Sequence, residues 1–198
     1  MGRPREFDET QAVDAASRVF WSKGYEATST QDLCDATGLG RSSIYNTFTS
    51  KHHLFLRALT HYAGTMTDRQ ARLLDEGAGT GLERIRALLA LIVRSEMESR
   101  EGGVSVGCFT VNTLTALAAR DAGVAEVLEK DLRRRLALLR AVVEDGRRDG
   151  SITSARDAEG LAWYLVSVIS GMRVAAQAGA GRVELDQIAA AGVDALSP

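Results

Sequence analysis

Residues 29–51, with the sequence STQDLCDATGLGRSSIYNTFTSK, predict two short helices joined by a glycine turn. Ser29 and Asp32 have the S-x-x-D spacing of a helix N-terminus, where both side chains accept hydrogen bonds from free backbone N–H groups. Gly38 and Gly40 end this helix, because glycine adopts the positive φ of a tight turn at little cost. A second helix is expected over residues 41–47. The stretch therefore has the organisation of a helix-turn-helix.

The second of these helices has one apolar face and an otherwise polar circumference. Ile44 and Phe48 share the apolar face, and hydroxyl, amide and guanidinium groups occupy the rest. Such groups match the donors and acceptors of base edges and phosphates. We therefore expect this helix to enter a DNA major groove.

A longer segment, GYEATSTQDLCDATGLGRSSIYNTFTSKHHLF, resembles the N-terminal DNA-binding domain of the TetR family of bacterial transcriptional regulators. The resemblance runs from about Asp8 to Leu59. It rests on a Gly-Tyr before the first motif helix, a Tyr-x-x-Phe and a Ser-Lys-x-x-Leu. At Thr30 the chain departs from the many relatives that have an apolar residue there.

The resemblance implies specific DNA contacts for three groups of residues. Thr30 and Gln31 would contact phosphate and base. The expected base readers are Arg41, Ser42 and Ser43, and the residues expected to grip the backbone are Tyr45, Asn46, Thr47 and Lys51.

The placement of charge, rather than its total, supports DNA binding. The whole chain has a formal net charge of −2, and residues 1–57 contain seven Lys and Arg against seven Asp and Glu. No acidic residue lies between Asp35 and Asp68, however, and that interval contains three basic residues and all three histidines. Counterion release rewards cations near phosphates, so a local absence of acids suits this surface. The alternative is that acidic residues are absent from this packed helix pair by chance.

Composition predicts an all-α protein with two domains. The chain is 198 residues long and 45% hydrophobic, has prolines only at positions 4 and 198, and lacks sustained alternation of polar and apolar residues. We expect a three-helix helix-turn-helix domain over residues 1–57 and a helical ligand-binding and dimerisation bundle over residues 58–198. Neither a membrane span nor a signal peptide is apparent, so a cytoplasmic location is expected.

Further helix starts are predicted at Asp8 with Gln11, at Ser50, at Asp121, and at Ser154 with Asp157. A short helix from Val106 is expected after a break at residues 102–103. The basic arm at residues 2–5 suits a minor groove as well as it suits a disordered terminus.

The helix predicted after Ser154 is apolar on nearly all sides and must be covered by its own bundle or by another subunit. The TetR resemblance implies that the last two helices pair with those of a second copy. A homodimer would place two recognition helices on a pseudo-palindromic operator.

The same resemblance implies a repressor whose larger domain binds a small-molecule effector that releases the DNA. Aromatic and flexible apolar residues with a few polar groups suit such a ligand. The candidates are Met97, Cys108, Phe109, Asn112, Trp163, Tyr164 and Met172; ordinary core packing is the alternative for each.

Cys108 has a second interpretation. It follows Gly107 at an expected helix start, where the helix dipole favours a thiolate, and the surrounding segment resembles a TetR subgroup that includes electrophile- and oxidant-sensing repressors. Cys108 is thus either a sensing cysteine or a buried core cysteine. An inaccessible thiol that lies far from any cation would argue against sensing. Cys34 is expected in the core, and the spacing of the cysteines suggests neither a disulfide nor a metal site.

Two other classes of protein are alternatives to a DNA-binding regulator. No catalytic fingerprint or cofactor motif is present, and the histidines lack metal-ligand spacing, so we expect no enzyme, cofactor or metal. A helical dimer that binds a ligand or partner without DNA is the remaining alternative.

Overall fold

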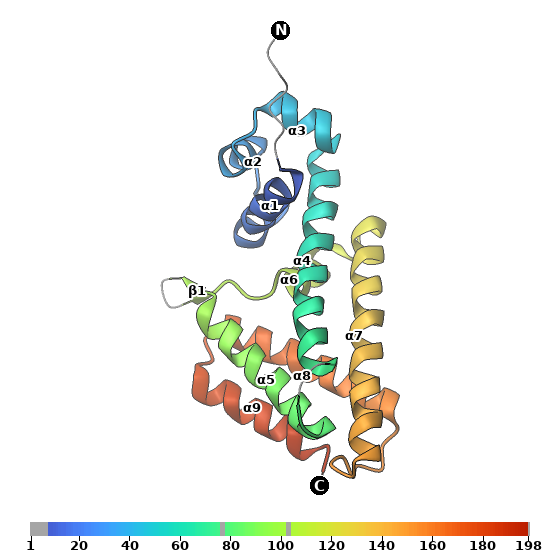
Figure 1. The fold of residues 1–198 in the computed structure, drawn as a ribbon. Helices are drawn as coiled ribbons and strands as arrows, with labels where there is room; N and C mark the ends of the chain where they lie inside the picture. Colours follow the sequence, from blue (N-terminus) through green and yellow to red (C-terminus); the bar gives the residue numbers. More distant parts are fainter. Residues whose placement is uncertain (1–7, 76–77, 102–103, 198) are drawn as a thin grey trace.

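The computed structural model describes residues 8–75, 78–101 and 104–197, and these are almost entirely helical (Figure 1). The helices are α1 (Glu9–Lys23), α2 (Thr30–Thr37), α3 (Arg41–Phe48), α4 (Lys51–Asp75), α5 (Gly81–Glu98), α6 (Phe109–Leu117), α7 (Ala122–Arg148), α8 (Ala158–Gln177) and α9 (Arg182–Asp194). Two-residue strands β1 (Arg100–Glu101) and β2 (Val104–Ser105) pair antiparallel. The predicted all-α fold is confirmed. The basic arm at residues 2–5 and the break at 102–103 lie outside the described residues.

Most helix ends follow the local signals of the sequence. Asp8 caps α1 by accepting hydrogen bonds from the N–H groups of Thr10 and Gln11, and Gly24 ends that helix at a φ of 78°. Asp121 caps α7 by accepting a hydrogen bond from Val124 N–H at 3.0 Å. These contacts involve residues two or three positions apart, so their spacing alone predicts them.

Two helices begin later than predicted. The cap of α8 is Asp157, which accepts from Gly160 N–H at 2.6 Å, and not Ser154. Ser154 is held outside the helix because its own N–H donates to the carbonyl of Leu196 at 3.0 Å. Similarly, α6 begins at Phe109 with Cys108 as its cap, and not at Val106.

Two hydrophobic clusters form the core, and α4 belongs to both. Leu54 and Phe55 of α4 join the cluster of α1–α3, whereas Leu74 joins the cluster of α5 and α7–α9. Phe109 and Val124, far along the chain, also pack in the first cluster. The expected domain boundary at residue 57 therefore falls within a continuous helix, which crosses from one end of the molecule toward the other (Figure 1).

Helix α8 combines a buried face with exposed apolar residues. Leu161, Leu165 and Met172 are at most 1% exposed, whereas Trp163 is 47% and Val174 is 52% exposed. Within the described ranges, none of the helices has the length and apolarity needed to cross a membrane.

Helices α5 and α7 approach so closely at Gly81 that no side chain fits between them. A Cβ atom added there would lie 2.5 Å from the Cα of Gly146 and 2.7 Å from the carbonyl oxygen of Val142. Both are backbone atoms, which cannot rotate away. The crossing is fastened by Gly81 N–H, which donates to Asp149 at 2.8 Å, and by the 2.7 Å ion pair of Arg84 with Asp145.

We expect Gly81→Ala to lower the free energy of unfolding by about 1–3 kcal/mol, because the new methyl group overpacks this crossing. Gly64→Ala is the matched control: a Cβ there meets no atom within 4 Å, so the change should stabilise α4 by about 0.5–1 kcal/mol. Urea unfolding followed by circular dichroism measures both. Equal stability of Gly81→Ala and the wild type would contradict the packing argument.

Candidate DNA interface and buried polar site

The N-terminus of α2 is fixed by reciprocal hydrogen bonds and an ion pair. Ser29 Oγ accepts from Asp32 N–H at 3.1 Å, while Asp32 accepts from Ser29 N–H at 2.9 Å. Lys23 Nζ lies 2.6 Å from the other oxygen of Asp32. The hydrogen bond from Lys23 and those from Ser29 lower the pKa of Asp32 to about 2. Helix α2 is thereby attached to the end of α1.

The turn after α2 orients α3 so that its polar face is open. Gly38 adopts the left-handed conformation, with φ 69° and ψ 12°, and its N–H donates to Cys34 at 2.9 Å. Ile44 and Phe48 anchor α3 in the core at 1% and 0% exposure. Gly40 caps α3 without a side-chain hydrogen bond, which leaves the N–H groups of its first turn to other acceptors.

The structure gathers the predicted DNA-contacting residues at one end of the molecule, on α2, α3 and the start of α4. Thr30 Oγ1 and Tyr45 Oη lie 3.2 Å apart, so the two motif helices are joined on this side. The exposed residues are Gln31, Arg41, Ser42, Tyr45 and Asn46, and the half-buried ones are Thr30, Ser43, Thr47 and Lys51.

Lys51 is held at the N-terminus of α4 by an aromatic ring. Its Nζ lies 4.5 Å from the ring centroid of Tyr25, a cation–π distance. Ser50 Oγ accepts from His53 N–H at 3.0 Å, and the first turn of α4 contains no acidic residue. A cation and a helix N-terminus at one place favour an anion such as phosphate.

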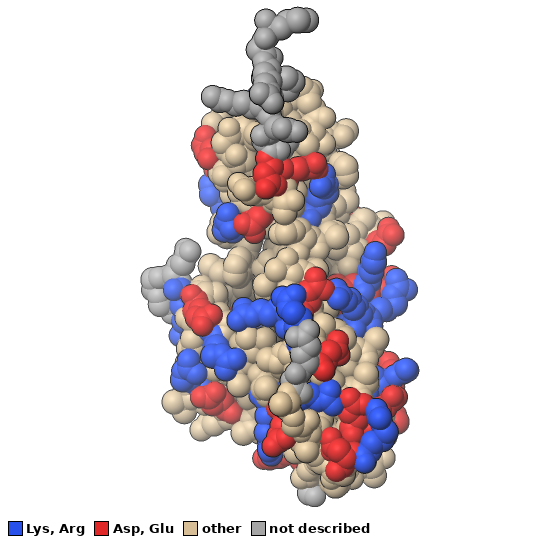
Figure 2. All heavy atoms as spheres, viewed as in Figure 1, with Lys and Arg blue, Asp and Glu red and all other residues tan. Residues whose placement is uncertain are grey.

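Figure 2 shows how charged side chains are distributed over the face in view. Uncharged atoms cover much of the upper right, whereas Lys, Arg, Asp and Glu side chains lie on the left and lower part of the first domain and over the larger domain. Residues of the acid-free interval nevertheless meet carboxylates from other segments, since Arg57 pairs with Glu9 and His52 lies 2.6 Å from Asp121.

Two long-range hydrogen bonds connect the DNA-binding end to the larger bundle. His52 Nε2 lies 2.6 Å from the carboxylate of Asp121, the cap of α7, and Trp21 Nε1 of α1 donates to the carbonyl of Gly107 at 2.9 Å. Hydrogen bonds from Val124 N–H and from His52 lower the pKa of Asp121. Sequence reasoning missed both links, because their partners are 69 and 86 residues apart.

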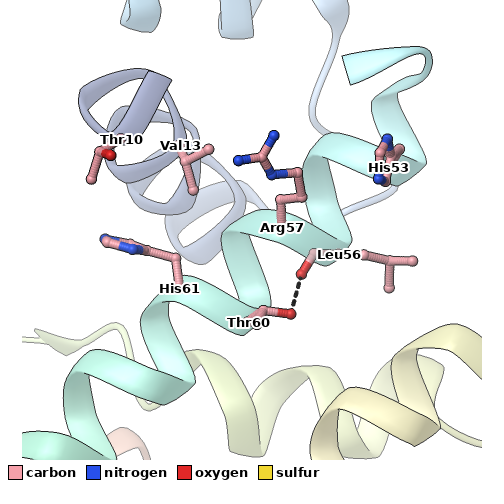
Figure 3. Close-up of a pocket in the computed structure, with 7 residues that line it drawn as sticks. All are labelled: Thr10, Val13, His53, Leu56, Arg57, Thr60 and His61. Carbon is pink, nitrogen blue, oxygen red and sulfur yellow. Dashed lines mark hydrogen bonds between the residues drawn. The ribbon is translucent and has the colours of Figure 1, made fainter. Parts of the chain in front are cut away.

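A hollow of about 450 Å³ lies between α1 and α4 (Figure 3). Thr10 and Val13 of α1 face Arg57 and His61 of α4 across it. Arg57 is ion-paired with Glu9, and His61 Nε2 lies 3.9 Å from Asp14. The cations of this hollow are therefore matched by carboxylates of α1. It belongs to the packing of the first domain.

The structure does not bring the predicted effector residues together. Phe109 and Asn112 line a cavity of about 490 Å³ beside α1, whereas Trp163 lines a separate apolar hollow with Leu114. The remaining three pack with the core of the larger bundle: Met172 is fully buried, and Met97 and Tyr164 are partly buried. Six of the seven candidates thus divide between two hollows and the core.

The seventh candidate, Cys108, belongs to a buried polar cluster at the junction of the domains. Its Sγ lies 3.1 Å from Thr110 Oγ1 and accepts a hydrogen bond from Tyr62 at 3.9 Å. Arg173 of α8 and Glu96 of α5 complete the cluster, with Nη1 and Oε1 4.0 Å apart. Sequence reasoning did not predict Arg173, which stands among apolar residues of α8, or Glu96, which stands among polar residues at the end of α5, because neither has a motif around it.

Burial and charge act in opposite directions on the Cys108 thiol. Burial raises its pKa, but Arg173 and the hydrogen bond from Thr110 lower it, and the net direction is downward. Cys108 is 3% exposed, so the first criterion against sensing, inaccessibility, is met. The second criterion, distance from any cation, is not met, because Arg173 acts on the thiol. Cys34 and Cys108 are both free.

Two family models match the chain in succession. Residues 12–58 match "Bacterial regulatory proteins, tetR family", and residues 81–191 match "Tetracyclin repressor-like, C-terminal domain". The HTH-type transcriptional repressor ComR of Escherichia coli is 32% identical over 189 residues, which cover 95% of this chain and 88% of ComR.

Solved structures show the same arrangement. A cysteine mutant of the TetR-family regulator CifR, complexed with 26-bp operator DNA, superposes with a TM-score of 0.82 at 31% identity and covers 98% of this chain and 100% of CifR. The reduced form of E. coli NemR shares the fold, with a TM-score of 0.84 at 20% identity, and covers 96% of this chain and 98% of NemR. The chain belongs to the TetR family and is a DNA-binding transcriptional regulator, not an enzyme.

Proposed function

We propose that this regulator is a homodimeric repressor that binds a pseudo-palindromic operator and leaves it when a small-molecule effector binds the larger domain. The observation that carries DNA binding is the open polar face of α3 beside the Lys51 end of α4. The relatives ComR and BdcR, both named repressors, support the sign of regulation, and the CifR complex supports double-stranded operator DNA.

The proposed division of the DNA contacts follows from exposure and position. Arg41 is exposed at the first turn of α3 and reads bases, because a guanidinium can donate two hydrogen bonds to a guanine edge. Lys51 sits at the start of α4, steadied by Tyr25, and contacts phosphate. The first contact carries sequence information and the second carries affinity.

Arg41→Ala should cost about 1–3 kcal/mol of operator binding and relax preference at one base pair, whereas Lys51→Ala should weaken all sequences alike and reduce the salt slope by about one. Footprinting on selected genomic fragments identifies the operator, and gel shifts over a salt series measure both variants. Unchanged sequence preference of Arg41→Ala would remove it from the base-reading set, and failure of the wild type to bind any fragment would favour the DNA-free alternative.

Dimerisation through α8 and α9 is supported by their exposed apolar residues. Trp163 and Val174 of α8 and Val183 of α9 are 47%, 52% and 66% exposed. Association with a second copy would remove this apolar surface from water. It would also place two copies of α3 at a fixed separation, as an operator with two half-sites requires.

Val174→Glu should convert the dimer to a monomer at micromolar concentration, because association would bury an unpaired carboxylate. Thr65→Glu, an exposed position of α4, is the control and should leave the dimer intact. Light scattering coupled to gel filtration gives the masses. A Val174→Glu variant that remains dimeric would place the interface elsewhere.

Release requires an effector with higher affinity for a conformation that does not fit DNA. A preference of about 100-fold contributes about 2.7 kcal/mol against operator binding. The links from His52 to Asp121 and from Trp21 to Gly107 connect the larger bundle to α4 and α1, so movement of α7 or of the segment before α6 would be transmitted to α3.

A second candidate function, sensing of electrophiles through Cys108, is favoured by the nearby guanidinium of Arg173. The thiolate would add to one carbon of an electron-poor C=C bond, forming a C–S bond and breaking the π bond, and the carbanion left at the neighbouring carbon would take a proton from water. Burial of Cys108 opposes this reaction, so the segment before α6 would have to open first.

In a Cys34→Ser background, N-ethylmaleimide should add one equivalent to Cys108 of the native protein and reduce operator binding at least tenfold. The Cys108→Ser variant should bind the operator normally and ignore the reagent. Intact-mass spectrometry and gel shifts follow the two effects. Labelling of Cys108 only after denaturation would rule out sensing and leave a core cysteine.

A further inference from the structure

A cavity of about 270 Å³ opens between α1, α4, α5 and α8, directly beside the buried polar cluster. Its walls are partly apolar, with Trp21, Tyr62, Met66 and Leu91, and Arg173 is part of the lining. We propose that this cavity binds a small organic carboxylate, with the carboxylate paired to Arg173 and a compact apolar body between the walls.

Arg173 is a buried cation without a carboxylate at hydrogen-bond distance. The residue is 9% exposed, and its nearest carboxylate oxygen, Glu96 Oε1, is 4.0 Å away, beyond hydrogen-bond distance. The Cys108 thiol and the Tyr62 hydroxyl also lie near Arg173 and, with Glu96, raise its pKa against the opposing effect of burial. Among the described residues, no carboxylate lies within hydrogen-bond distance of Arg173. A guanidinium has five N–H donors, and with no carboxylate in reach it favours an acceptor-rich anionic ligand.

Glu96 does not compensate Arg173 fully because it is engaged elsewhere. Its Oε2 accepts a hydrogen bond from Ser105 Oγ at 3.0 Å, which holds the carboxylate away from the guanidinium. Burial raises the pKa of Glu96, with Arg173 and Ser105 opposing that shift. A ligand carboxylate on the open side of Arg173 would therefore supply the partner that Glu96 does not.

The apolar part of the lining suits a ring or short chain. The rings of Trp21 and Tyr62 lie with centroids 5.5 Å apart, and Leu91 is 6% exposed. The volume is below the usual range for drug-sized ligands, so the body must be compact. Arg69 at the rim adds a second cation, whereas Glu98 at the rim disfavours larger anions that reach it.

This site deepens the proposed function and rests on it for its regulatory role. Trp21 and Gly107 both line the cavity and are joined by the 2.9 Å hydrogen bond between α1 and the segment before α6. A ligand between them would contact both partners of a link between the domains. Its binding would favour a different position of α1, which braces the DNA-binding helices.

The test uses 3-phenylpropanoate, with 3-phenylpropanamide as its uncharged analogue, titrated into the full chain without DNA and followed by calorimetry. Neither compound contains an electrophilic C=C bond, so neither can alkylate Cys108. The calorimeter therefore measures reversible binding alone. We expect the carboxylate to bind at least tenfold more tightly than the amide. Equal affinity for the two compounds, or no heat of binding up to millimolar concentration, would overturn the proposal.

Two variants assign the site. Arg173→Gln should weaken carboxylate binding at least tenfold, and Met66→Phe should weaken both compounds by filling the cavity while leaving the guanidinium in place. Arg94→Gln, an exposed position of α5 outside the lining, is the matched control. If Arg173→Gln fails to fold, Met66→Phe decides. Unchanged binding in Met66→Phe would overturn the assignment to this cavity.

An operator gel shift separates this inference from the proposed function. Binding of the carboxylate with release of DNA supports both. Binding of the carboxylate without release of DNA supports the site but shows that this ligand does not control operator binding. Normal operator binding with no affinity for the carboxylate overturns the site and leaves the repressor function standing.

Discussion

The continuity of α4 is the constraint on which the rest of the structure depends. One helix supplies the end of the DNA-binding surface at Lys51, core residues of the first cluster at Leu54 and Phe55, and a core residue of the second cluster at Leu74. A rigid helix shared by two cores cannot move at one end without moving at the other. Phe109 of α6 packs on Phe55 of α4 with ring centroids 5.8 Å apart. The larger bundle is therefore coupled to the first cluster by this side-chain contact as well as along α4.

Polar groups at the domain junction determine where a ligand could alter this coupling. His52 with Asp121 and Trp21 with Gly107 are satisfied pairs that join the two parts. Arg173 differs, because its carboxylate partner is distant and held by Ser105. A buried, weakly paired charge costs free energy, which a ligand of opposite charge can recover.

Helix positions and the exposed polar face of α3 could be predicted because their signals are local. The cap of Ser29 with Asp32, the glycine turn at Gly38 and the anchors Ile44 and Phe48 all act within one or two helical turns. The two late helix starts have the opposite cause: Ser154 is tied to Leu196, far away in sequence, and that contact overrides its capping pattern. The residues predicted to bind an effector do not form one site, because aromatic and flexible residues are also ordinary core residues.

By itself the sequence determined the order of the helices, the recognition motif and the acid-free interval around it, since each depends on residues near one another in the chain. Only the tertiary structure decided which distant residues meet. It placed Cys108 beside Arg173, left Glu96 at 4.0 Å from that guanidinium, and opened the cavity next to Trp21. Such contacts depend on how α1, α4, α5 and α8 pack, and the amphipathic pattern of a helix specifies that it is covered but not by what.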